Sequence, residues 1–125
     1  MTKTVVLVGH CGADSAYLRV AVGGVAKGVS IISADEETAL DEILAKGAVL
    51  LLVNRQLDYG FPTYEGVELI RSLKSRSPHL RMMLVSNYEE AQEAAIAVGA
   101  LPGFGKREIG TEKARDRLRA ALMDE

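Results

Sequence analysis

The chain has 125 residues, 48% of them hydrophobic and 26% charged, and this length predicts one compact domain over residues 1–125. Its net charge of −2 argues against a protein whose main task is to bind nucleic acid, because phosphate binding relies on an excess of basic residues. No apolar run approaches the roughly 20 residues of a membrane span, and the single cysteine, Cys11, cannot form an internal disulfide, so we expect a cytoplasmic protein without membrane contact.

The first part of the chain alternates apolar runs with helical spacing. Residues 4–8 (TVVLV) and 29–33 (VSIIS) predict strands, the first of them buried on both faces. Between them, apolar residues at helical spacing predict a helix that ends near Gly28. The pair Gly23 and Gly24 lies inside this helix and should weaken it by about 1 kcal/mol per residue relative to alanine.

A second helix and the most apolar strand follow. The spacing of Ser33 and Glu36 predicts a capping box at the start of the helix. Residues 48–53 (AVLLLV) are the most apolar run of the chain, and they predict the central strand of a sheet. This strand is followed by Asn54 and by a long loop that reaches residue 64.

The second part of the chain repeats the alternation. A helix is predicted after the long loop, and residues 81–85 (RMMLV) and 101–105 predict two further strands. Between these strands lies an alanine-rich helix, with Asn87 and Glu90 at capping spacing before it. A final helix is predicted to begin at Thr111.

Five strands that alternate with five helices predict βαβ units, and hence a parallel sheet with right-handed crossovers. At this length we expect an α/β, doubly wound, flavodoxin-like fold with strand order 2-1-3-4-5 and helices on both faces. Functional groups in such sheets gather where the strands end. The residues at these ends are Gly9, His10, Cys11, Asp35, Asn54, Arg55, Ser86, Asn87, Lys106 and Arg107.

Two of the strand ends form a specific pattern, with Ser86 after the fourth strand and Lys106 after the fifth. Together with YEGVELIRSLK at residues 64–74, this pattern resembles the receiver domain of two-component response regulators, over essentially the whole chain. The resemblance implies a phosphorylation site in which an acidic pair helps to hold Mg²⁺ and an aspartate accepts the phosphoryl group. Ser86 and Lys106 match the two positions that contact this group in that family.

The acidic positions of the family are replaced in this chain. The acidic pair falls on Gly9 and His10, the phosphoacceptor falls on Asn54, and Arg107 stands where the family usually has proline. Mg²⁺ requires hard, mostly anionic oxygen ligands, and phosphoryl transfer requires a positioned nucleophile with its metal. We therefore predict no metal site, no cofactor, no phosphorylation by the usual aspartate mechanism and no enzymatic activity.

The predicted function is that of an atypical, or pseudo-, receiver domain. Such a domain would serve as a protein–protein interaction or regulatory module in bacterial signal transduction. The resemblance implies a partner surface formed by the helix before residues 101–105, that strand and the final helix, with homodimerisation as one use of it. The basic residues of the final helix would lie on this surface: Lys113, Arg115, Arg117 and Arg119.

The alternative function is binding of an anionic small molecule or cofactor in the strand-end pocket. Loss of the family's acids leaves Lys106, Arg107 and Arg55, so we expect a pocket of reversed, basic charge. The only acids predicted nearby are Asp14, Asp35 and Asp58. Within this pocket, the side-chain oxygen of Asn54 is expected to accept a hydrogen bond from Lys106.

His10 and Cys11 are adjacent residues of types that bind zinc. A metal site is not the favoured interpretation, because adjacent residues rarely chelate one ion and no fourth ligand is evident. His10 is expected to form a hydrogen bond within its loop, with a role as a pH-sensitive group as the alternative. Cys11 is expected to be a small filler and not a reactive thiol.

Overall fold

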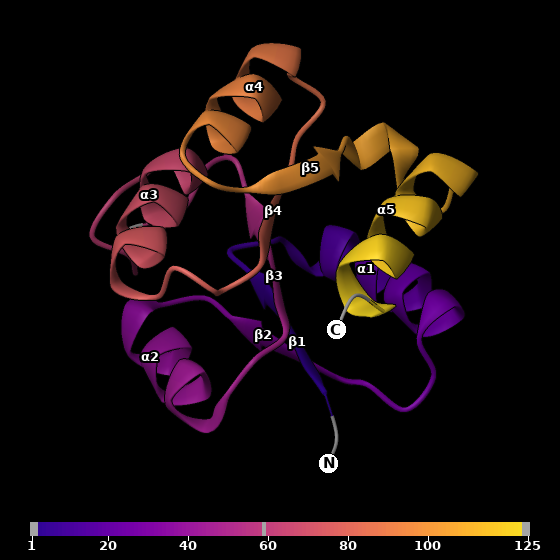
Figure 1. Cartoon of the computed structure of the whole chain (residues 1–125), viewed down its shortest axis with the longest axis horizontal. Helices are drawn as coiled ribbons and strands as arrows, with labels where there is room; N and C mark the ends of the chain where they lie inside the picture. The colour runs from indigo at the N-terminus through magenta and orange to yellow at the C-terminus, as the bar shows by residue number, and fades with distance from the viewer. Residues whose placement is uncertain (1–2, 59, 124–125) are drawn as a thin grey trace.

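The computed structural model describes residues 3–58 and 60–123 and contains a five-stranded parallel sheet. The order β2-β1-β3-β4-β5 confirms the predicted doubly wound topology (Figure 1). The strands are β1 (Thr4–Val8), β2 (Ser30–Ala34), β3 (Leu50–Asn54), β4 (Met82–Val85) and β5 (Leu101–Phe104). The helices are α1 (Gly12–Val25), α2 (Glu37–Lys46), α3 (Gly66–Arg76), α4 (Glu89–Ala97), the short 3-10 helix η1 (Lys106–Glu108) and α5 (Glu112–Met123). Within the described ranges, no helix has the length and apolar character needed to cross a membrane.

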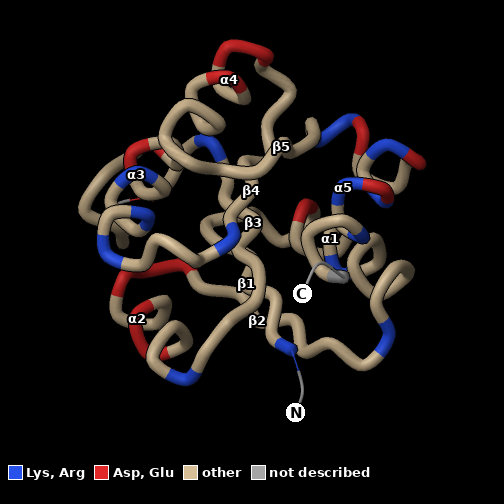
Figure 2. Tube along the Cα trace, in the orientation of Figure 1, with Lys and Arg blue, Asp and Glu red and all other residues tan. Residues whose placement is uncertain are grey.

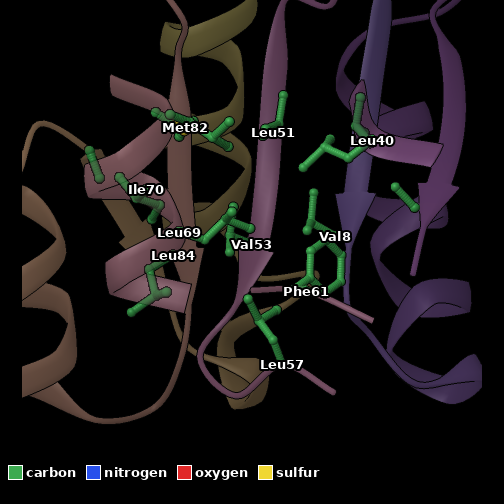
Figure 3. Close-up of a cluster of buried hydrophobic side chains, with 14 of the residues drawn as sticks. Val8, Leu40, Leu51, Val53, Leu57, Phe61, Leu69, Ile70, Met82 and Leu84 are labelled. Atoms are coloured by element: carbon green, nitrogen blue, oxygen red, sulfur yellow. The ribbon is translucent and has the colours of Figure 1, made fainter. Parts of the chain in front are cut away.

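The sheet is buried because helices cover both of its faces. On one face, α2, α3 and α4 pack against alternate strand residues, among them Val8, Val53 and Leu84 (Figure 3). On the other face, α1 and α5 cover the intervening residues, such as Leu7 and Leu52. Successive side chains of a strand point to opposite faces, so a sheet covered on both sides requires apolar residues at nearly every position.

The pairing register brings the carboxyl ends of the strands to one edge of the sheet. Val8 pairs with Ala34 on one side and with Val53 on the other, and Asn54 pairs with Val85. The residues that directly follow these strands therefore lie side by side, as expected at the switch point of a doubly wound sheet.

The long loop after β3 is packed onto the core. Leu57 and Phe61 are only 5% and 6% exposed, and the backbone N–H of Leu57 donates to the carbonyl of Tyr64 at 2.8 Å. Gly66 then begins α3 against the end of β3, where a Cβ atom would collide with the carbonyl oxygen of Asn54. The loop therefore forms one wall of the strand-end region.

Helix α1 differs from the prediction at its C-terminal end. It ends at Val25, not near Gly28, and it runs through Gly23 and Gly24 without interruption. Neither of these two glycines has a positive φ, and a Cβ atom added to either would meet nothing within 4 Å. The described contacts of the chain therefore do not require glycine at positions 23 and 24.

The predicted side-chain cap is present in α5 but not in α2 or α4. The backbone N–H of Ala114 lies 3.4 Å from the hydroxyl of Thr111, which confirms the predicted cap of α5. The capping box predicted for α2 is wrong, because Ser33 belongs to β2 and Glu36 is the N-cap without a side-chain hydrogen bond. The N-cap of α4 is Tyr88, one residue after the predicted cap.

Candidate functional site

Two pockets open at the carboxyl edge of the sheet, and both have Asn54, Gln56 and Lys106 in their walls. The larger, of about 440 Å³, is also lined by Gly9, His10, Cys11, Asp14, Asp35, Asp58 and Phe61. The smaller, of about 220 Å³, is also lined by Arg55, Val85, Ser86, Asn87 and Tyr88. We call them the acidic pocket and the basic pocket. The site residues predicted from the strand ends are therefore brought together, but they are divided between two pockets of different charge.

The prediction of a basic strand-end pocket is correct for the smaller pocket and wrong for the larger one. Three aspartates line the acidic pocket, and Lys106 is the one Lys or Arg among its described lining residues. In the basic pocket Lys106 is joined by Arg55, and the lining residues include no carboxylate. Arg107 lines neither of these two pockets. The separation arises because α1, the end of β2 and the loop after β3 supply acids on one side of Lys106, whereas the end of β4 supplies none on the other.

Asn54 uses its side chain as a donor between two loops. Its Nδ2 donates to the carbonyl of Gly9 at 3.1 Å and to the carbonyl of Gln56 at 2.8 Å. The Oδ1 atom is buried and has no hydrogen-bond partner in the described part of the chain. An ionised aspartate has no proton to donate, so a carboxylate here would face two carbonyl oxygens. The amide is thus required by its local partners and is not merely a neutral copy of aspartate.

Lys106 forms an ion pair with Asp14, so the predicted hydrogen bond to Asn54 is wrong. Its Nζ lies 3.0 Å from Oδ2 of Asp14, which α1 positions across the acidic pocket. The hydrogen bond from Lys106 and its positive charge lower the pKa of the Asp14 carboxyl. A charge-assisted hydrogen bond is roughly twice as strong as a neutral one, so a carboxylate within reach is preferred to the amide of Asn54.

Gly9 stands where the resemblance to receiver domains leads one to expect the first residue of an acidic pair, and the local backbone favours glycine there. Its φ is +74°, and a Cβ atom would lie 2.6 Å from Cδ2 of Leu57. An aspartate at this position would be strained in its backbone and would push into a buried leucine. The backbone at position 9 and the packing of the loop after β3 therefore both disfavour an acidic side chain at this position.

His10 is buried, with an exposed fraction of 8%, and its Nε2 lies 2.8 Å from the carbonyl oxygen of Leu52. Because a carbonyl only accepts, this contact identifies Nε2 as the protonated nitrogen. Nδ1 is buried without a partner in the described residues. Burial lowers the pKa of His10 below its ordinary value of 6.5, and the charge of Lys106 acts in the same direction. The expected hydrogen bond is present, but it reaches into the sheet and not into the histidine's own loop.

Neither His10 nor Cys11 points to a metal centre. Within residues 3–58 and 60–123, no group of three or more His, Cys, Asp or Glu side chains could hold a metal ion. Cys11 is exposed, and its Sγ accepts from the backbone N–H of Asp14 at 3.4 Å, so it caps α1. The prediction that Cys11 fills a small internal space is therefore wrong.

Arg55 and Tyr88 both line the basic pocket, and their side chains contact each other. The guanidinium carbon of Arg55 lies 4.4 Å from the centroid of the Tyr88 ring, a cation–π contact. Ser86 is buried at 4% exposure, and its hydroxyl oxygen accepts from the backbone N–H of Tyr88 at 3.1 Å. Ser86 therefore fixes the start of α4, which in turn presents the tyrosine ring to the arginine.

Gln92 is a structural residue of the site that sequence reasoning missed. Its Nε2 lies 2.8 Å from the carbonyl of Leu84 and 3.1 Å from the carbonyl of Ser86, which ties α4 to the end of β4. Asn87 acts similarly, because its Oδ1 accepts from the backbone N–H of Arg107 at 3.0 Å. The available signal was a polar side chain on the otherwise alanine-rich inner side of a predicted helix.

No protein-family model matches the sequence, and a search of curated protein sequences finds no match. Solved structures do match at the level of the fold. The receiver domain of the DNA-binding response regulator merR from Colwellia psychrerythraea 34H is 11% identical, with a TM-score of 0.76, over 98% of this chain and 99% of that one. The beryllofluoride-activated NtrC4 receiver domain dimer is 16% identical, with a TM-score of 0.77, over 98% of both chains.

A third match is the receiver domain of the response regulator NarL from Mycobacterium tuberculosis. It is 18% identical, with a TM-score of 0.69, over 98% of this chain and 94% of that one. The chain therefore has the flavodoxin-like fold of response-regulator receiver domains, as the strand-end pattern predicted.

Proposed function

We propose that this chain, which has the receiver fold, acts as a protein–protein interaction module in bacterial signal transduction without phosphorylation of an aspartate. The observation that carries the proposal is the state of Asn54 and Lys106. The amide of Asn54 bridges the Gly9 and Gln56 carbonyls, and Lys106 is paired with Asp14. The Nδ2 group of Asn54 and the ammonium group of Lys106 therefore both have partners inside the chain.

The surroundings of Asn54 support the absence of aspartate chemistry. Phosphoryl transfer to a receiver requires a carboxylate nucleophile and a cation that neutralises the developing charge. The side chain at position 54 is an amide, and a side chain at position 9 would strain the backbone. The Nε2 atom of His10 is already hydrogen-bonded to the carbonyl of Leu52. Changing one of these residues alone does not rebuild a metal-assisted acceptor.

The proposed partner surface comprises α4, β5 and α5. It carries acids on α4 and mixed charges on η1 and α5 (Figure 2). Two of the four basic side chains of α5 are ion-paired, since Lys113 pairs with Glu108 at 2.9 Å and Arg119 pairs with Asp116 at 2.8 Å, whereas Arg115 and Arg117 donate to backbone carbonyls. Tyr88 and Ile96 are 60% and 45% exposed, and they supply apolar contact area on this surface. Specificity would therefore rest on these two side chains and on the acids of α4.

The direct test is incubation with acetyl phosphate and Mg²⁺, followed by mass spectrometry of the intact chain. We expect no phosphorylated species, and a base-labile acyl phosphate on the chain would contradict the proposal. Partner binding is tested with the immobilised chain and its Ile96→Asp variant. Ile32→Asp is the matched control, because Ile32 is 38% exposed on β2, at the opposite edge of the sheet.

A second candidate function is binding of a small anion in the basic pocket. The supporting observation is that Arg55 and Lys106 line about 220 Å³ without a carboxylate among the lining residues. It ranks below the first proposal because Asp14 already neutralises Lys106. Thermal-shift measurements with inorganic phosphate and phosphorylated metabolites test it. A shift that Arg55→Ala abolishes and Arg71→Ala preserves would favour this second function, since Arg71 is a surface arginine paired with Glu68.

A further inference from the structure

Helix α1 presents an uncharged surface to solvent. Six of its residues are all exposed and recur at helical spacing: Ala13, Ala16, Tyr17, Val20, Gly23 and Gly24. At about 100° per residue they cover roughly a third of the helix circumference, on the side away from Leu18 and Val22, which pack in the core. We call these six residues the α1 stripe. Tyr17 is 65% exposed and Val20 is 76% exposed, so the stripe has two large apolar side chains at its centre.

The two charged residues of α1 are both turned back onto the body of the chain. Asp14 pairs with Lys106 at 3.0 Å. Arg19 donates from Nη1 to the carbonyl of Ile31 at 2.8 Å and from Nη2 to the hydroxyl of Ser33 at 3.1 Å. The stripe is left neutral, and most of α1 is uncharged in Figure 2. A partner that covers it must also be neutral, because a charged face would lose its hydration there without gaining a counter-charge.

The glycine pair in the stripe has no explanation inside the described chain. Gly23 and Gly24 lie inside α1 without a positive φ, and a Cβ atom at either would meet open space. Glycine in a helix interior destabilises the helix relative to alanine, so this pair carries a cost without an internal contact to justify it. Bare backbone at two consecutive exposed positions allows another chain to approach α1 closely.

We propose that the α1 stripe binds the α1 stripe of a second copy of this chain, with the two helices antiparallel about a two-fold axis at Val20. Tyr17 lies three residues before Val20, and Gly23 and Gly24 lie three and four residues after it. The two-fold axis therefore places each Tyr17 ring over the bare backbone of the other copy's glycine pair. A self-complementary patch of this kind is what an isologous interface requires. In this arrangement one uncharged α1 stripe packs against another, so no charged side chain is buried.

The predicted dimer is weak and reversible. The 14 residues of α1 extend over only about 21 Å, which is short for the roughly 800 Å² per partner of a standard specific interface. The α1 stripe lies on the opposite side of the sheet from α4 of the proposed partner surface, whereas α5 of that surface packs beside α1 (Figure 1). Substitutions at Val20 and at Ile96 therefore test the two interfaces separately.

Sedimentation equilibrium of the full chain over a wide concentration range tests the inference. We expect a monomer–dimer equilibrium whose Kd rises at least tenfold in Val20→Asp and does not change in Ile96→Asp, the matched exposed position on α4. Gly24→Ala should raise the thermal unfolding midpoint, because alanine stabilises a helix relative to glycine and its methyl group meets open space in the single chain. The same substitution should raise the Kd, because the methyl group would occupy the contact between the two helices in the dimer. A chain that stays monomeric throughout overturns the inference, as does a dimer lost in Ile96→Asp but kept in Val20→Asp.

Position-specific cross-linking gives a second readout that does not depend on affinity. In a Cys11→Ser background, the thiols introduced by Val20→Cys should form an intermolecular disulfide under mild oxidation, since the two copies of residue 20 meet at the axis. The same background with Ile96→Cys should remain uncrosslinked. Cross-linking through position 96 and not through position 20 would overturn the proposed arrangement.

Discussion

The ammonium group of Lys106 lies 3.0 Å from the carboxylate of Asp14, and this ion pair joins the end of β5 to α1 across the strand-end site. Lys106 lines both the acidic and the basic pocket, whereas Asp14 lines only the acidic one. The ion pair also gives the Lys106 ammonium group a partner other than Asn54, whose amide group donates to the carbonyls of Gly9 and Gln56. The ion pair of Lys106 and the two hydrogen bonds of Asn54 therefore share no side chain.

The ion pair should contribute modestly to stability. Asp14→Asn is expected to lower the free energy of unfolding by about 0.5–1 kcal/mol, because the two side chains are 21% and 37% exposed and solvent screens their attraction. Urea unfolding at pH 7 measures this change. A double-mutant cycle with Lys106→Met should return a coupling of similar size, and a coupling of zero would show that the pair does not stabilise the fold.

Asn54→Asp is expected to destabilise the chain at pH 7, by about 1–3 kcal/mol, because the carboxylate would leave the Gly9 and Gln56 carbonyls without a donor. Asn87→Asp is the matched control, since the Asn87 side chain uses its oxygen as an acceptor and a carboxylate can replace it. Urea unfolding should separate the two variants. We also expect Asn54→Asp to show no tight Mg²⁺ binding by titration calorimetry, because Gly9 and His10 remain.

Placing an acid at position 9 should destabilise the fold because of backbone strain and steric conflict. Gly9→Asp is expected to cost more than about 2 kcal/mol of unfolding free energy, because φ is +74° and the new Cβ would lie 2.6 Å from Leu57. Gly12→Asp provides the control: this glycine opens α1, a Cβ there meets nothing within 4 Å, and a carboxylate favours a helix N-terminus. Equal unfolding midpoints for the two variants would contradict this prediction.

Stability should fall as the pH falls through the ordinary range of histidine. Burial lowers the pKa of His10 in the folded chain, so below about pH 6.5 the unfolded chain binds a proton that the folded chain resists. The free energy of unfolding should then decrease by up to about 1.4 kcal/mol per pH unit until the lowered folded pKa is reached. His10→Gln should remove this slope, whereas His79→Gln, at an exposed position, should keep it.

A second loss of stability is expected below about pH 4. The pKa of Asp14 is lowered by its hydrogen bond from Lys106, and the pKa of Glu108 is lowered first by the hydrogen bond from the Gly105 N–H and then by Lys113. Groups with a lowered carboxyl pKa stabilise the fold above their ordinary pKa and lose this effect when protonated. Acid unfolding monitored by circular dichroism should shift to higher pH in Glu108→Gln, and an unchanged midpoint would exclude a role for this carboxylate.

Much of the candidate site could be located from the sequence, but its internal contacts could not. The end of the most apolar run placed Asn54 at the edge of the sheet beside Ser86 and Lys106, and the structure places all three there. The partner of Lys106 was mispredicted because a lysine side chain with four rotatable bonds reaches several neighbours, and which neighbour is nearest depends on how α1 sits. The burial of His10 likewise depends on its packing near Leu52 of β3, which lies 42 residues away in the chain.

The sequence by itself determined the alternation of strands and helices, the five-stranded parallel order and the residues at the strand ends, because hydrophobic periodicity and chain connectivity are local properties. Only the tertiary structure decided that Asp14 pairs with Lys106, that the strand-end region has an acidic and a basic side, and that a Cβ atom at position 9 would collide with Leu57. These facts depend on distances between elements that are remote in the chain. Such distances are set by the packing of α1 and of the loop after β3 onto the sheet, and no local pattern of residues encodes them.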